Sequence, residues 1–190
     1  MKIDSIPAAY KYCRNYISVF LSGREKFAQK NPVVWNAFIA ACTAELPSAM
    51  AHKARTELAP AVFTLGEGPL VVISDKLDKA ECGVFRGKSN FFDYSYAIFV
   101  SDRAADAYEH GTGWKVWEGI LLHESVHWVR HEAGATNPAL PMPGISSYGF
   151  VADGEVGDVF EQRAYGFGVC QEKSGKLLQI GPPGTEPASP

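Results

Sequence analysis

His123-Glu124-Ser125-Val126-His127 stands near the end of an apolar run, residues 114–129, that has the length and pattern of a buried helix. Leu122, Val126 and Val129 recur at helical spacing and would face the core. Two histidines four positions apart on a helix lie on one face, one turn above the other. The stretch therefore predicts a helix that holds two imidazole rings side by side.

This pair of histidines predicts a zinc site. Imidazole nitrogens bind zinc, and a catalytic zinc usually has three protein ligands and a water molecule. Glu124, directly after the first histidine, would reach that water and act as its base. The plainer interpretation is a structural pair of core histidines. The position of both histidines in the middle of a helix, in a motif that arises rarely by chance, favours the zinc site.

The third ligand should come from a second predicted helix, which begins at residue 153 or 155 and runs to residue 170. Glu161 is the expected ligand, because it lies between Phe160 and Ala164, where an unpaired carboxylate would be costly and a cation would compensate it. The alternative is that Glu161 pairs with an arginine, either Arg130 or Arg163.

Glu155 and Asp158 are the other candidates for the third ligand. Both lie near the start of the predicted helix, where the helix dipole favours acidic residues without any metal. His131 lies one turn beyond His127, but a straight helix separates it from His123 by about 12 Å, too far for one ion. We expect His131 at the rim of the site.

The chemistry that these residues indicate is hydrolysis. Zinc lowers the pKa of its water and polarises a carbonyl group, while Glu124 takes the water proton and passes it to the leaving amine. The oxyanion needs a second donor beside the metal. Tyr165, on the helical stripe of Glu161, is the residue we select, and Tyr148, His131 and Arg130 stay open. A strand at residues 96–100 would offer an edge for an extended peptide.

Composition limits the class of protein. The 190 residues are 46% apolar, 21% charged and 12% aromatic, which is ordinary for a soluble globular domain. A net charge of −3 and a pI near 6.0 give no basic field, so nucleic acid is not an expected partner. We expect no membrane span and no cleavable signal, since no apolar run is long enough.

The four cysteines are Cys13, Cys42, Cys82 and Cys170, and they form no CxxC motif. A domain of this size does not need disulfides for stability, and Cys13 and Cys42 fall on apolar helical faces. We expect the cysteines to be reduced.

Periodicity predicts a single domain over residues 1–172, helical in residues 1–58 and carrying the sheet and active site in residues 59–172. A flexible tail follows at residues 173–190. The expected helices are 10–30, a second one from residue 32, 48–58, 102–109 and 113–132. The expected strands are 61–65 and 70–74, as a hairpin, and 96–100, and residues 135–151 are an expected loop.

The HExxH motif followed by Glu161-Gln-Arg-Ala164-Tyr165 resembles the gluzincin pattern of zinc metallopeptidases, with Tyr165 where many members carry Asp. The resemblance implies that Glu161 is the third zinc ligand and that Ala164 packs against the active-site helix. More specifically, residues 112–170 resemble the metallopeptidase effector domains, or toxins, that bacteria deliver into rivals.

Motif and resemblance together predict an α+β, zincin-like fold, with a helical N-terminal half, a small sheet, the HExxH helix and a second helix that carries a metal ligand. The expected function is zinc-dependent hydrolysis of a peptide or amide bond by an antibacterial toxin. Its substrate would be a cell-wall peptide or a target-cell protein, reached by a specialised secretion system that delivers to the target-cell periplasm. An immunity protein would be its partner.

Two alternatives remain at the level of sequence. The first is a cytoplasmic housekeeping or regulatory zinc protease. The second is a zincin-fold binding module without catalytic activity, against which Glu124 argues.

Overall fold

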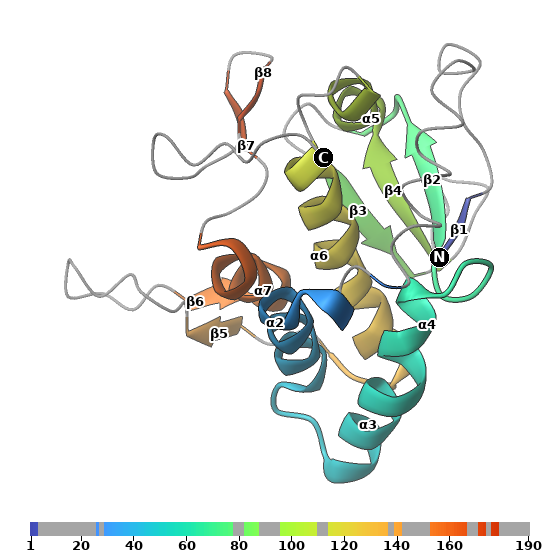
Figure 1. Ribbon diagram of the computed structural model, residues 1–190, viewed down its shortest axis with the longest axis vertical. Helices are drawn as coiled ribbons and strands as arrows, with labels where there is room; N and C mark the ends of the chain where they lie inside the picture. Colours follow the sequence, from blue (N-terminus) through green and yellow to red (C-terminus); the bar gives the residue numbers. More distant parts are fainter. Residues whose placement is uncertain are drawn as a thin grey trace, which may run out of the picture.

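The computed structural model describes residues 1–3, 26, 29–77, 82–87, 96–109, 114–136, 139–141, 153–166, 171–173 and 176–178. The expected α+β class is confirmed. A four-stranded sheet packs against one long helix, and further helices pack against the other side of that helix (Figure 1).

The sheet has the strand order β1 (Lys2–Ile3), β2 (Leu70–Ser74), β4 (Ala97–Ser101) and β3 (Gly83–Arg86). β1, β2 and β4 are parallel, and β3 runs antiparallel to β4 at the edge. All five residues of β4 are buried, as in a central strand covered on both faces, whereas the four residues of β3 are half-buried.

Helices form the rest of the core. They are α2 (Pro32–Thr43), α3 (Ser48–Lys53), the π-helical turn η2 (Ala54–Leu58), α4 (Ala59–Phe63), α5 (Asp102–Glu109), α6 (Trp114–Glu132) and α7 (Val156–Tyr165). Two small antiparallel ribbons join β5 (Ala139–Pro141) to β6 (Asp153–Glu155), and β7 (Gln171–Lys173) to β8 (Lys176–Leu178).

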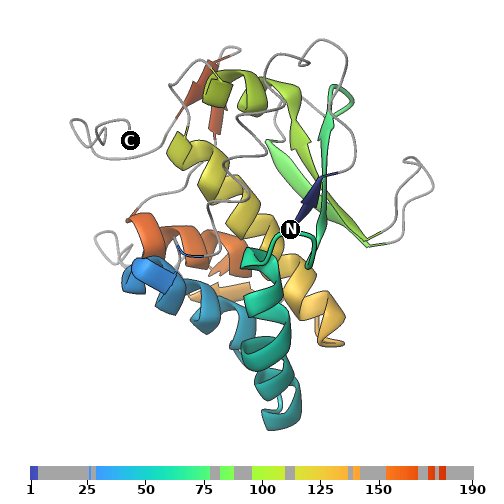
Figure 2. The same ribbon diagram turned by 45° about the vertical axis from the view of Figure 1, so that its right-hand side comes forward.

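α6 is the central element, because it lies between the sheet on one side and the helices α2 and α7 on the other (Figure 2). α2 begins at Asn31, whose side chain accepts a hydrogen bond from the N–H of Val34, and continues with Pro32. Phe38 of α2 packs edge-on against Phe160 of α7, with ring centroids 5.9 Å apart, and both are fully buried. α2 thus fixes α7 beside α6.

The hairpin expected at residues 61–74 is wrong. Residues 48–63 are one helical run through α3, η2 and α4, and Ala59, Val62 and Phe63 lie on its buried side. Gly66 and Gly68 then turn the chain with φ angles of 84° and 65°. β2 follows as expected, but it pairs with β1 and β4. The apolar run at 61–65 was too short for its period to separate a strand from a helix end.

The strand expected at residues 96–100 is present as β4, shifted by one residue. It cannot offer an edge, because β2 and β3 occupy its two sides. The edge beside β4 belongs to β3, a four-residue strand that the sequence did not predict, and β1 forms the opposite edge.

Other expectations have mixed outcomes. The helices at 48–58, 102–109 and 113–132 and the one starting at 32 are confirmed. α7 is shorter than expected, because Gly166 ends it in a left-handed conformation. The helix at 10–30, the loop at 135–151 and the tail at 173–190 fall mostly outside the described residues. The described residues of the tail, 173 and 176–178, belong to the ribbon of β7 and β8, and residues 139–141 of the expected loop form β5. Within the described part, no helix has the length and apolar character needed to cross a membrane.

Cys42 is free and buried, as expected. Cys82, directly before β3, is disulfide-bonded, with its partner outside the described residues. For Cys82 the expectation of a reduced thiol is therefore wrong.

Candidate metal centre

His123 and His127 lie one turn apart in α6, with ring centroids separated by 5.2 Å. His127 is 8% exposed, and the side chain of His123 is 15% exposed. The apolar residues Leu122, Val126 and Val129 are buried, as their spacing predicted. α6 therefore presents both imidazole rings, largely shielded from solvent, to the start of α7.

Glu155 is the carboxylate that contacts both histidines. It is the N-cap residue of α7, where its extended backbone precedes the first helical turn. Its carboxylate contacts Nε2 of His123, and its two oxygens lie 3.2 and 3.1 Å from Nε2 of His127. The Glu155 side chain is 46% exposed, so this side of the centre is open to solvent.

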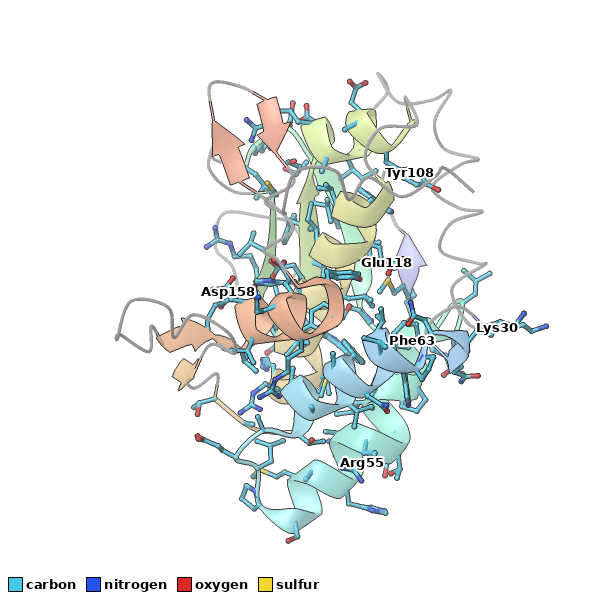
Figure 3. All side chains as sticks on the ribbon, turned by 60° about the vertical axis from the view of Figure 1, so that its left-hand side comes forward. Lys30, Arg55, Phe63, Tyr108, Glu118 and Asp158 are labelled. Carbon is cyan, nitrogen blue, oxygen red and sulfur yellow. The ribbon has the colours of Figure 1, made fainter. Side chains whose placement is uncertain are left out.

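Glu161 approaches His123 from the other ring nitrogen. Its Oε1 lies 2.8 Å from Nδ1 of His123, and Glu161 is only 5% exposed. Asp158 lies one turn earlier, toward the end of α7 that carries Glu155 (Figure 3). Thus the two nitrogens of one imidazole ring face two different carboxylates of α7.

In the described part of the chain, two groups of three side chains bring their ligand atoms within 4.8 Å of one another. One group is His123, His127 and Glu155, and the other is His123, Asp158 and Glu161. The expected set of His123, His127 and Glu161 is not among them, because Glu161 lies on the Nδ1 side of His123, away from the nitrogens that Glu155 contacts.

Glu124 is held against the edge of the sheet. Its Oε2 accepts a 2.6 Å hydrogen bond from the backbone N–H of Phe85 in β3, and its Oε1 lies 3.8 Å from Nε2 of His123. The residue is 7% exposed. One carboxylate oxygen is therefore fixed while the other faces the nitrogen available to a metal, which suits the role of base.

Carboxylates dominate the electrostatics around His123. Burial lowers the pKa of His123, but its hydrogen bonds with Glu155 and Glu161 outweigh burial and raise that pKa well above its usual value. Burial raises the pKa of Glu155, and the two histidines more than reverse this, so that it lies far below its usual value. Burial raises the pKa values of Glu124 and Asp158. The carboxylates around His123 therefore favour a positive charge at this position.

The donor set fits a metal ion of the zinc type. Tetrahedral zinc with ligands at about 2.0–2.2 Å places those ligand atoms roughly 3.4 Å apart. The ligand atoms of His123, His127 and Glu155 already lie within 4.8 Å of one another. Because Glu161 binds Nδ1 of His123, Nε2 is the nitrogen left for an ion.

Tyr165, expected as the oxyanion donor, is used elsewhere. Its hydroxyl donates a 2.8 Å hydrogen bond to Oε1 of Glu118, which is 1% exposed. Glu118 lies five residues before His123, about 140° around the helix. Figure 3 shows Glu118 toward the end of α7 opposite to Asp158. The structure therefore does not bring the Tyr165 hydroxyl to the histidines.

Arg130 ties two helices together. It is 2% exposed, and its guanidinium donates to the carbonyl oxygens of Ala41 (3.2 Å), Ala44 (2.8 Å) and Thr136 (3.1 and 2.8 Å). Ala41 and Ala44 stand at the C-terminal end of α2, whose last carbonyls need donors. Arg130 is thus engaged neither with Glu161 nor at the metal centre.

Of the other donor candidates, His131 packs against the rings of Phe85 and Tyr96, at centroid distances of 5.5 and 5.1 Å. It belongs to neither of the two ligand groups among the described residues. Tyr148 lies outside the described residues.

Two residues contribute to the site that the sequence did not predict, Phe85 and Gly157. The N–H of Phe85 could not be foreseen, because a backbone group carries no sequence signal. Gly157 could have been noticed, since a glycine inside a helical pattern costs stability and commonly marks a close approach. A Cβ atom at position 157 would lie only 2.5–2.6 Å from three ring atoms of His123.

Comparison with known proteins adds one finding. A family model described as metallopeptidase toxin 3 matches residues 7–166 of the chain. The matched region begins well before residue 112 and takes in the strands β2, β3 and β4 as well as the helices α2, α6 and α7. No curated protein and no solved structure matches the chain.

Proposed function

The chain belongs to the metallopeptidase toxin 3 family, and on this premise we propose that it hydrolyses a peptide or amide bond with one zinc ion bound by His123, His127 and Glu155. The observation that carries the proposal is the convergence of these three side chains within 4.8 Å, beside a glutamate with one free carboxylate oxygen. Glu155 replaces Glu161 as the proposed third ligand, because among the described carboxylates it is the one that contacts Nε2 of both histidines.

A zinc ion bound there supplies a Lewis acid and lowers the pKa of a bound water. Glu124 would serve as the proton acceptor through Oε1, because the N–H of Phe85 already occupies Oε2. The same carboxyl group would deliver the proton to the leaving nitrogen. Burial raises the pKa of Glu124, which brings it closer to the value that suits a base and acid near neutral pH.

The substrate is proposed to bind as an extended strand along β3. The carbonyl of Cys82 accepts a hydrogen bond from the N–H of Ser101 in β4, so residue 82 faces into the sheet. By alternation the backbone groups of Gly83 and Phe85 face outward at the open edge. An added peptide strand would use the backbone groups of Gly83 and the carbonyl of Phe85, because the N–H of Phe85 already donates to Glu124, and it would pass directly over Glu124.

The place of action is proposed to be the periplasm of a target cell, reached through a specialised secretion system, with a cell-wall peptide or a target-cell protein as substrate. Membership of a toxin family supports a target outside the producer. The disulfide at Cys82 supports an oxidising compartment, since disulfides are rare in reducing cytoplasm. An immunity protein that blocks the centre would protect kin cells.

Elemental analysis with Glu124→Gln tests the catalytic proposal. Wild-type protein should carry about one equivalent of zinc, and Glu124→Gln should keep it while toxicity falls by about 10²–10⁴. A wild-type chain that neither carries nor binds zinc would exclude the proposal. Full toxicity of Glu124→Gln would favour the binding-module alternative.

Expression in two compartments of a bacterium tests the place of action. A version with an added signal peptide should kill, whereas the cytoplasmic version should be harmless or weakly harmful. Equal killing from both compartments would indicate a cytoplasmic protein target. Analysis of cell-wall fragments after killing then separates a cell-wall peptide from a protein substrate.

A further inference from the structure

We propose that Gly157 and Glu161, one turn apart on α7, act together as a positioning pair for His123: Gly157 leaves the space that the ring occupies, and Glu161 holds its Nδ1. This inference rests on the proposed zinc centre. It gives Glu161 a role that differs from that of a ligand, and it gives the glycine a role in metal binding.

The steric half of the pair comes from the close packing of α7 on the ring. A Cβ atom at position 157 would lie 2.5, 2.5 and 2.6 Å from Cδ2, Nε2 and Cε1 of His123, distances that real Cβ contacts essentially never show. The ring has little freedom to retreat, because Glu161 holds Nδ1 on one side and Glu155 contacts Nε2 on the other. Any side chain at position 157 would therefore displace the nitrogen that binds zinc.

The electrostatic half comes from Glu161. A carboxylate on Nδ1 fixes the proton there, which selects the tautomer with a bare Nε2 and increases the basicity of that nitrogen. Glu161 is 5% exposed, so solvent screens this interaction little. Residues four apart on a helix share a face, which is why one helix supplies both the space and the carboxylate.

His127 provides an internal comparison. Its Nδ1 is buried and has no hydrogen-bond partner in the described part of the chain. The two histidines of the motif are therefore held differently, and the docking of α7 determines the orientation of His123. Loss of the positioning pair should weaken metal binding through His123 while leaving His127 in place.

The first experiment measures zinc affinity of the purified full chain by competition with a chromogenic chelator. Gly157→Ala and Glu161→Gln should each bind zinc about 10–100-fold more weakly than wild type. Arg163→Ala, at an exposed position of the same helix, is the matched control and should bind zinc as wild type does. Alanine in place of a helical glycine ordinarily stabilises a helix, so weaker zinc binding by Gly157→Ala cannot come from helix propensity.

The second experiment reads the orientation of His123 directly and does not depend on Gly157→Ala folding. In the zinc-bound wild type, ¹⁵N-edited NMR should show a slowly exchanging proton on Nδ1 of His123. In Glu161→Gln this proton should exchange faster, while the spectrum of His127 changes little. Circular dichroism of each variant checks that the fold is intact.

The outcomes separate the two proposals. Failure of the wild type to bind zinc would overturn the proposed function and the positioning pair with it. Zinc binding by the wild type, together with unchanged affinity in both variants, would overturn the positioning pair alone. Loss of zinc from Glu161→Ala as complete as that from His127→Ala would also overturn it, because Glu161 would then be a ligand.

Discussion

Replacement of Arg130 by methionine should destabilise the fold without touching the metal centre. Methionine fills much of the same volume, so the variant keeps the packing of the side chain while it removes the hydrogen-bond donors and the charge of the guanidinium. The guanidinium of Arg130 serves three carbonyl oxygens, those of Ala41, Ala44 and Thr136. Ala41 also accepts a hydrogen bond from the N–H of Ala44 at 3.4 Å, so two carbonyls lose their donor in the variant.

The hydrogen bonds to Ala44 and Thr136 are only part-buried, so each loss should cost about 1 kcal/mol, the lower end for an acceptor left without a donor, which gives about 2 kcal/mol for two carbonyls. Burial lowers the pKa of Arg130, which shows that the charge itself is disfavoured here, and the variant recovers part of that cost. The net loss should be about 1–2 kcal/mol. For a chain of this size that lowers the Tm by roughly 2–8 °C.

Urea unfolding of the metal-free protein, followed by circular dichroism, measures this loss. Arg163→Met, at an exposed position of α7, is the control and should stay within about 0.5 kcal/mol of wild type. Zinc content should be the same in all three proteins. If Arg130→Met were as stable as the control, the hydrogen bonds from Arg130 to the three carbonyls would contribute little to the stability of the fold. If it were stable, bound zinc and lacked toxicity, Arg130 would act on the substrate instead.

Three further predictions concern the metal centre and its surroundings. Tyr165→Phe should lose about 1–2 kcal/mol of stability in urea unfolding, because the buried carboxylate of Glu118 loses a donor. The variant should remain toxic in the periplasm, and a loss of toxicity would restore Tyr165 as a catalytic residue. Removal of zinc by a chelator should lower the unfolding free energy by about 2.7 kcal/mol relative to protein with free zinc at 100 times the Kd. Thermal melts measure this change, and an unchanged Tm would argue against a zinc site that exists only in the folded protein. In the metal-free protein, the raised pKa of His123 stabilises the folded state below about pH 6.5, and this stability should be lost as pH rises through that raised pKa. His123→Gln should flatten this part of the plot of unfolding free energy against pH. A plot identical to that of wild type would contradict the assigned cause.

The helical half of this fold was readable from the sequence because helical spacing is a local property. α6 and α2 carry apolar residues at the helical period over 19 and 12 residues, long enough for the period to be unambiguous. The prediction of a strand at residues 61–65 was wrong, because a segment of five residues, four of them apolar, fits either a strand or the end of a helix. β3 was not predicted, because its four residues include a glycine and are too few to show a hydrophobic period. Its place at the edge of the sheet depends on pairing with β4.

The metal centre was half predictable for a similar reason. The relation of His123 to His127 is local, since both belong to one helix. The choice between Glu155 and Glu161 depends on how α7 docks, and both carboxylates reach His123, at different nitrogens. Glu161, in the middle of its helix, does have a partner, as expected. That partner is the Nδ1 atom of His123, a proposed ligand.

The order of the centre along the chain has a consequence for its synthesis. Glu155 follows His127 by 28 residues, which a ribosome adds in roughly 1–6 s. Until then the nascent chain contains the two histidines and Glu124 but neither the proposed third ligand nor the helix that orients His123. A truncated product that ends before residue 153 would therefore be inert, and the producing cell meets an assembled peptidase only after the last described helix of the chain has emerged and docked.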